Sequence, residues 1–203
     1  MQSSTTVRLL EWSSTDDNQF VSYQGSNSKL DLFQITKEKY KRVNLIGSRE
    51  INQISCMEFA NNLHGVQQNL AIGTANGGVS LIDFAPGSSD IIINNQSKYG
   101  RRPCTGVAWN PQVPGVLAAA FDKLRSDYSC IIWDIQGRVG DDKEESNVLF
   151  RLSFDEAASS LAWIPMDAQL LAIGTSKGLL RIYDTRVKNK PIEAFMAQVS
   201  LGF

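Results

Sequence analysis

The residues of this 203-residue chain best suited to chemistry are three thiols and one imidazole. The cysteines are Cys56, Cys104 and Cys130, and the only histidine is His64. A structural zinc site needs four such ligands at close and regular spacing, which these residues do not have. The cysteines lie within expected strands, so we predict buried, reduced thiols, as is typical of a cytosolic or nuclear compartment. We predict no metal site and no cofactor.

A second candidate for chemistry is the acidic run that follows Gly140, made up of Asp141, Asp142, Glu144 and Glu145. Acid–base catalysis by paired carboxylates needs a pocket that raises the pKa of one of them. This run lies in a polar stretch between expected strands, where water keeps every carboxylate ionised. We also expect no nucleophile elbow of the Gly-x-Ser-x-Gly type and no phosphate-binding Gly-x-x-x-x-Gly-Lys loop. We therefore predict that the chain is not an enzyme.

Charge and hydropathy exclude further classes of function. The chain has 20 basic and 21 acidic residues, so its net charge of -1 lacks the basic footprint of nucleic-acid-binding domains. The basic group of Lys37, Lys39, Lys41 and Arg42 is interleaved with Glu38, which favours a solvated strand over a phosphate site. The sequence shows no signal peptide and no transmembrane span. We expect no nucleic-acid partner, and membrane association only through other proteins.

These residues are positioned by a fourfold internal repeat with a period of about 50 residues. The same place in successive copies is held by Phe33, Ile82, Trp133 and Tyr183. Each copy has a first strand that ends on an aromatic residue, a second strand rich in small residues, and a third strand that ends in Asp in three of the four copies. This ending is typical of WD repeats, each of which forms one blade of a β-propeller. We attribute the small residues of the second strands to crowding near the propeller axis.

The expected strands and turns follow from this repeat. Asn76-Gly77 supplies the positive φ of a tight hairpin turn, and Lys177-Gly178 resembles it. The first strands are expected at 7–12, 54–59, 104–109 and 159–163, the second at 20–23, 70–74, 116–120 and 170–175, the third at 30–33, 79–83, 131–134 and 180–184, and the fourth at 40–46, 90–94, 147–154 and 192–197.

The sequence thus predicts an all-β fold that is an incomplete WD-repeat β-propeller, with one domain over residues 1–203. The blades are expected at roughly 7–50, 51–98, 102–154 and 157–198, and the first strand of a fifth at 199–203. Since an unclosed arc exposes blade faces and edges, we expect a fragment of a longer protein or a chain that folds against a partner.

Six side chains hold the structural positions of the WD repeat. The Gly-His dipeptide that many WD repeats place before the first strand is missing from all four copies, so the usual buried His-Asp network cannot form. The acids of the repeat are expected to accept hydrogen bonds from Ser or Thr hydroxyls or from backbone amides instead. The six residues are Trp109, Trp133, Asp134, Trp163, Tyr183 and Asp184.

The third repeat resembles one family in particular. The runs Gly106 to Pro111 and Leu117 to Ile135, with Leu70 to Val79 and Leu161 to Pro165, are similar in order and spacing to the Mios family. Members of that family are WD-repeat subunits of the GATOR-type complex, called the SEA complex in fungi, which regulates TOR kinase signalling in response to amino acids. The resemblance covers most of the chain.

The most specific part of the resemblance is the segment with Asp122, Lys123, Arg125 and Asp127, between the second and third strands of the third repeat. Two interpretations remain open. The two acids pair with the two cations and hold a surface loop in one shape, or the loop contacts a partner, as ordered loops on rigid scaffolds often do.

The resemblance implies a non-catalytic scaffold whose partners are other propeller and solenoid subunits of a multiprotein complex. It also implies a cytoplasmic location, peripheral at the vacuolar or lysosomal membrane. Without the resemblance, a scaffold of a coat or nuclear-pore assembly and a substrate adaptor of a ubiquitin ligase remain alternatives. A propeller enzyme would need polar residues converging on the central channel, whereas we expect inner strands made mainly of Val, Ala, Leu and Ile.

Overall fold

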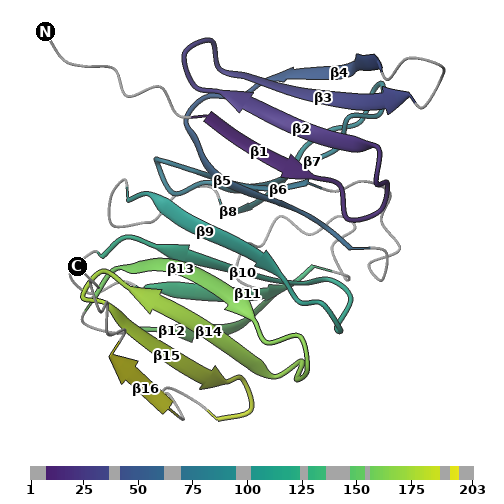
Figure 1. The fold of residues 1–203 in the computed structure, drawn as a ribbon. Coiled ribbons are helices and arrows are strands. Elements are labelled where there is room, and N and C mark those ends of the chain that lie inside the picture. Colours follow the sequence, from purple (N-terminus) through teal and green to yellow (C-terminus); the bar gives the residue numbers. More distant parts are fainter. Residues whose placement is uncertain are drawn as a thin grey trace, which may run out of the picture.

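The computed structural model describes residues 8–36, 42–61, 70–94, 102–123, 128–135, 147–153, 156–187 and 193–196. These residues form four antiparallel sheets, each with four strands that pair in chain order. Such a meander is the blade of a propeller. Figure 1 shows the four blades following one another in an arc, with blades 1 and 4 at its opposite ends. Among the described residues there is no helix of the length and apolar character needed to cross a bilayer.

The strand bounds are as follows. Blade 1 comprises β1 (Arg8–Trp12), β2 (Gln19–Gln24), β3 (Lys29–Thr36) and β4 (Arg42–Glu50). Blade 2 comprises β5 (Ile54–Phe59), β6 (Leu70–Thr74), β7 (Val79–Ile82) and β8 (Ile91–Asn94). Blade 3 comprises β9 (Cys104–Trp109), β10 (Val116–Phe121), β11 (Cys130–Asp134) and β12 (Val148–Leu152). Blade 4 comprises β13 (Ala158–Trp163), β14 (Leu170–Thr175), β15 (Leu179–Asp184) and β16 (Glu193–Met196).

Strands β3 and β4 are longer than the sequence pattern predicted. They pair along their whole length, from Lys29 opposite Glu50 to Thr36 opposite Arg42, with a bulge between Leu32 and Phe33. We expected the outer strand to end at residue 46. The ladder instead continues to Glu50, and Arg49 near its end contacts blade 2.

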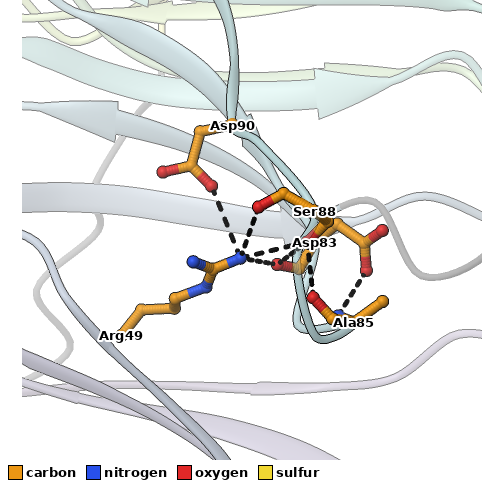
Figure 2. A network of polar contacts seen from close by, with 5 residues as sticks. All are labelled: Arg49, Asp83, Ala85, Ser88 and Asp90. Carbon is orange, nitrogen blue, oxygen red and sulfur yellow. Dashed lines mark hydrogen bonds and ion pairs between the residues drawn. The ribbon is translucent and has the colours of Figure 1, made fainter.

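That contact is a polar network centred on Arg49 (Figure 2). Its Nη2 donates to the main-chain oxygen of Asp83 at 2.5 Å and to the Ser88 hydroxyl at 3.0 Å, and it lies 4.0 Å from Asp90 Oδ1. The Asp83 carboxylate accepts the amide of Ala85 at 2.9 Å and shapes the turn that Arg49 contacts. One guanidinium on blade 1 therefore binds the connection between β7 and β8 of blade 2.

The hydrophobic core consists of three clusters, one at each interface between successive blades. Every residue of β10 is buried. Ala119 packs in the cluster shared with blade 2, whereas Ala118 and Ala120 pack in the cluster shared with blade 4. The small residues of this second strand are therefore explained by packing on both faces of the sheet.

Our explanation of the small second strands by crowding at the axis is wrong. The strands that approach one another from blade to blade are the first strands, because β1 contacts β5, β5 contacts β9, and β9 contacts β13. The hairpin turn predicted at Asn76-Gly77 is confirmed, since Gly77 has a φ of 89° and donates its amide to the Thr74 oxygen at 3.0 Å.

Candidate functional site

One surface of the arc is built from the turns between second and third strands and from the connections that enter each blade. In blades 2, 3 and 4 the amide of the residue that follows the second strand donates to a main-chain oxygen. That oxygen belongs to the last residue before the first strand of the same blade. This repeated bond fixes each turn relative to the neighbouring connection and makes the surface an ordered platform. The bonds run from Ala75 N to Gln53 O (2.8 Å), from Asp122 N to Pro103 O (2.9 Å) and from Ser176 N to Ala157 O (3.0 Å).

The loop that the sequence singled out begins on this platform. Asp122 and Lys123 are exposed directly after β10, and the Lys123 amide donates to Asp122 Oδ1 at 2.7 Å. Arg102 donates from Nη1 to the Asp122 main-chain oxygen at 3.3 Å. Arg125 and Asp127 lie outside the described residues. Asp122 is thus held by hydrogen bonds from its own amide, to its main-chain oxygen and to its carboxylate, while the ion pairs predicted for the loop remain a prediction.

Two buried ionisable residues behind this platform were missed by the sequence reasoning. Arg102 and Glu156 are each 4% exposed. Both stand two residues before the first strand of their blade, which begins at Cys104 and at Ala158 respectively. Aligning the repeats on their first strands would have found both residues. Blades 3 and 4 each place a charged residue in the connection where other WD repeats carry Gly-His.

Arg102 packs on its own blade. Its guanidinium carbon lies 4.6 Å from the centroid of the Phe121 ring, within the range of a cation–π contact. The main-chain oxygen of Arg102 also lies close to Gly77, where a Cβ would be 2.7 Å away. Since Gly77 already has a positive φ, this position requires glycine for two independent reasons.

Glu156 organises the equivalent position of blade 4. Its carboxylate accepts a hydrogen bond from the Thr175 hydroxyl and another from Arg181 Nη2, the latter at 2.5 Å. The hydroxyl of Ser129 on blade 3 donates to its main-chain oxygen at 3.1 Å. The bond from Thr175 and the charged partner Arg181 lower the pKa of Glu156 against the effect of burial. A carboxylate network therefore takes the place of the usual His-Asp network in this blade.

The structural WD positions lie in the blade interfaces. Trp109, Trp133, Trp163 and Tyr183 are buried. Asp184 accepts the Arg186 amide at 2.9 Å and the Arg186 guanidinium at 2.5 Å, and these bonds lower its pKa. The expected backbone amide is thus one donor to Asp184, while the guanidinium was not foreseen.

Asp134 closes β11 in blade 3. Its amide donates to the Asn147 oxygen at 2.9 Å, which joins the end of the third strand to the start of the fourth. The residue is partly buried.

The first strands are more polar than expected, whereas the second strands β6, β10 and β14 are mainly Val, Ala, Leu and Ile, as expected. The hydroxyls of the first strands cross from one blade to the next, because Ser55 donates to the Cys104 oxygen at 2.5 Å and Thr105 to the Ala158 oxygen at 2.6 Å. Glu58 accepts the Trp109 amide at 2.8 Å, and burial raises the pKa of Glu58 to about 7. These hydrogen bonds join blade 2 to blade 3 and blade 3 to blade 4.

A small cavity of about 130 Å³ lies between blades 3 and 4. Val116, Ile132 and Trp163 contribute to its wall, with Asn110, Gln169 and Thr185 as polar members. None of its lining residues is titratable. Small-molecule sites usually enclose about 300–1,000 Å³, so this cavity offers neither the room nor the groups for acid–base chemistry.

Residues 174–178 read Gly-Thr-Ser-Lys-Gly and match the pattern of a hydrolase nucleophile elbow, a match that the sequence reasoning overlooked. The structure places them in the hairpin turn between β14 and β15, where Gly178 has a φ of 76° and donates to the Thr175 oxygen at 3.0 Å. An elbow needs a turn from strand to helix. The pattern therefore has no catalytic meaning here.

The candidate site with the strongest geometric support is one face of blade 1. Trp12, Phe20 and Phe33 lie side by side on β1, β2 and β3, since Trp12 pairs with Phe20 and Phe20 with Phe33. The ring centroids are 5.2 and 5.1 Å apart. Trp12 is 50% exposed. We call this surface, together with its neighbours Leu10, Val43 and Leu45, the blade 1 face.

The other blades show what such a face normally does. The residue equivalent to Trp12 at the end of each first strand is covered by the preceding blade. The three equivalents are Phe59 (5% exposed), Trp109 (5%) and Trp163 (6%). The blade 1 face thus has the composition of a blade interface, and the described residues of this chain leave it open to solvent.

Comparison with known proteins agrees with the repeat and the fold. A family model described as "MIOS, WD40 repeat" matches residues 43–148, just over half of the chain. The chain belongs to the MIOS WD40-repeat family. Within this family, the GATOR2 complex protein MIOS-A of Xenopus laevis is 35% identical over 60% of the chain, and GATOR2 complex protein MIOS of Danio rerio is 31% identical over 58%. The chain spans 16% of the length of each of these two MIOS proteins.

A solved structure shares the fold of this MIOS-family chain. The structure titled "COPII on membranes, outer coat vertex" contains a chain that is 20% identical, with a TM-score of 0.68. The match covers 88% of the present chain and 47% of that chain. The MIOS-family chain is accordingly an incomplete WD-repeat propeller, as its sequence predicted.

Proposed function

We propose that this chain is a non-catalytic scaffold in a GATOR2-type complex that regulates TOR signalling in response to amino acids. Its relatives named GATOR2 complex protein MIOS support membership in such a complex. A binding role is supported mainly by the exposure of the blade 1 face. On this face Trp12 is half exposed, while its equivalents in the next three blades are buried.

The chemistry of the blade 1 face suits a protein partner. Three adjacent aromatic rings, flanked by the exposed side chains of Leu10 and Leu45, form an apolar surface on a four-stranded sheet. Exposed apolar patches of this kind mark interaction sites, and aromatic residues carry much of the binding energy in protein interfaces. The surface that matches it best is another WD blade, because each equivalent face in this chain packs against a blade.

The loop that begins at Asp122 is a second contact in this proposal. Its first residue, Asp122, is fixed on the platform of turns, because its amide donates to the Pro103 oxygen and its own main-chain oxygen accepts the Arg102 guanidinium. Arg125 and Asp127 belong to the same proposed contact. The partners are other propeller and solenoid subunits, and they attach the chain at the cytoplasmic side of the vacuolar or lysosomal membrane.

The likeness to a COPII coat structure concerns the fold alone and does not favour a coat function. A ubiquitin-ligase adaptor role has no specific observation in its support.

The proposal is tested by purifying the endogenous protein through an N-terminal tag and identifying the accompanying proteins by mass spectrometry. We expect other propeller and solenoid subunits of the TOR-regulating complex. Their absence from the wild-type purification would overturn the proposed function.

Two variants then locate the contacts. Trp12→Ser is expected to reduce recovery of these subunits, and Lys123→Glu with Asp122→Lys is expected to weaken it to a lesser degree. Met166→Ser is the matched control, because Met166 is 90% exposed and belongs to the connection between β13 and β14 of blade 4, which is part of neither proposed contact. Full recovery with Trp12→Ser would remove the blade 1 face from the proposal.

A further inference from the structure

Two thiols from different blades meet at the interface of blades 2 and 3. Cys56 lies on β5 and Cys104 opens β9, and their sulfurs are 3.7 Å apart. Both are free cysteines. They are 48 positions apart in the sequence, so the proximity is created by the packing of one first strand against the next.

The two sulfurs occupy a space that a neighbouring glycine leaves open. A Cβ on Gly73 of β6 would lie 2.4 Å from the Cys104 sulfur and 2.6 Å from the Cys56 sulfur. No side chain fits there while both thiols are in place. Glycine at position 73 of blade 2 therefore provides the space in which the two sulfurs meet, so the contact between the sulfurs is part of the packing of the interface.

The two thiols differ in access and in acidity. Cys104 is fully buried, whereas Cys56 is only partly buried. The hydrogen bond between the two sulfurs lowers the pKa of Cys56 and raises the pKa of Cys104. Cys130 is also fully buried, and burial raises its pKa to about 12. Cys56 is thus the thiol best placed to react first, and Cys104 is best placed to resolve the product.

We propose that Cys56 and Cys104 are an oxidative modification site that forms a reversible disulfide between blades 2 and 3 in response to hydrogen peroxide. The inference is independent of the function proposed above, since it rests only on the geometry of the two sulfurs and Gly73.

The reaction balances in two steps. The Cys56 thiolate attacks one peroxide oxygen, so that an S–O bond forms, the O–O bond breaks and hydroxide leaves, taking up the thiol proton as water. The Cys104 sulfur then attacks the Cys56 sulfenic acid, so that the S–S bond forms, the S–O bond breaks and the Cys104 proton leaves with the hydroxyl as a second water. The two thiols are oxidised by two electrons, and the peroxide is reduced to two waters.

The disulfide would connect the blades through their first strands. A disulfide bond is about 2.0 Å long, so the two sulfurs, 3.7 Å apart in the reduced chain, must move closer when it forms. The bond closes a loop that spans the connection between the two blades and restricts the unfolded chain. Oxidation is therefore expected to raise the melting temperature of the chain, and reduction by dithiothreitol is expected to reverse the rise.

The test uses the full chain treated with hydrogen peroxide, unfolded in the presence of an alkylating reagent and digested for mass spectrometry. We expect a linked peptide pair that contains Cys56 and Cys104, lost on reduction, with Cys130 recovered in alkylated form. Three alkylated cysteines after peroxide treatment, or a disulfide that includes Cys130, would overturn the proposal.

Two variants separate the steps. Cys104→Ser removes the resolving thiol, so Cys56 is expected to accumulate as a sulfenic acid that a dimedone reagent traps. Cys130→Ser is the matched control and is expected to form the disulfide at the wild-type rate, with near-ultraviolet circular dichroism confirming that both variants fold. Dimedone labelling of Cys104 instead of Cys56 in the wild-type chain would contradict the assigned order.

Discussion

The indole of Trp163 donates its N–H to the main-chain oxygen of Ala108 at 3.0 Å, across the interface between blades 4 and 3. Trp109 makes the equivalent bond to the Glu58 oxygen of blade 2, at 3.3 Å. The aromatic residue that ends each first strand therefore has two roles where it is tryptophan. It fills the interface and it satisfies a carbonyl on the blade before it. Trp12 carries the same donor on the open blade 1 face.

Replacing Trp163 with Phe is expected to lower the free energy of unfolding by about 1–2 kcal/mol, because the Ala108 oxygen loses a buried donor while the aromatic packing is largely kept. Urea denaturation followed by circular dichroism measures the change. Trp12→Phe is the matched control and should change stability by less than about 0.5 kcal/mol, since the Trp12 side chain is half exposed. Equal losses in the two variants would contradict the assigned role of the interblade bond.

Glu58 is expected to make the chain less stable as the pH rises. Burial raises the pKa of Glu58 from its ordinary value near 4.5 to about 7 in the folded chain. The favourable contribution of the protonated group is complete below pH 4.5 and is lost as the pH rises through 7. Glu58→Gln, which can still accept the Trp109 amide, should remove this part of the pH dependence. We expect the variant to be more stable than the wild type by roughly 2 kcal/mol at pH 8 and about equally stable at pH 4.5.

Glu156 has the opposite dependence on pH. The Thr175 hydroxyl and Arg181 lower its pKa, so its contribution is present above the ordinary carboxyl value and is lost as the pH falls through the lowered one. At pH 7 we expect Glu156→Gln to cost about 2 kcal/mol, because Arg181 is left without its charged partner. The difference from the wild type should shrink as the pH is lowered below 4.5, measured by denaturant titration at several pH values. A difference that is constant with pH would show that Glu156 acts through packing alone.

The Arg49 network predicts a specific loss at the interface of blades 1 and 2. Arg49→Ala removes the bonds to the Asp83 oxygen and the Ser88 hydroxyl and is expected to cost about 1 kcal/mol, since the guanidinium is partly solvated. Arg42→Ala is the matched control, because Arg42 is an exposed arginine on the same strand. Hydrogen exchange should show faster opening near residues 83–88 in Arg49→Ala only, and unchanged exchange there would argue against the network.

Which parts of this molecule could be foreseen depends on the range of the interactions involved. The period of the repeat, the Asp that closes three third strands and the Asn76-Gly77 turn are local, and they determined a WD-repeat propeller with strands close to their observed bounds. The turn needs positive φ at one residue, which glycine supplies, and so its geometry is set by the sequence itself.

The contacts between blades were decided by tertiary structure. Arg49 on β4 finds its partners in a turn of another blade, and the buried Glu156 carboxylate finds its partners in Thr175 and Arg181. The proximity of Cys56 and Cys104 likewise appears only when the first strands pack side by side. A repeat pattern determines what each blade buries, because burial follows from alternation along a strand. It does not determine which polar groups meet across an interface, because that depends on how one rigid sheet is placed on the next.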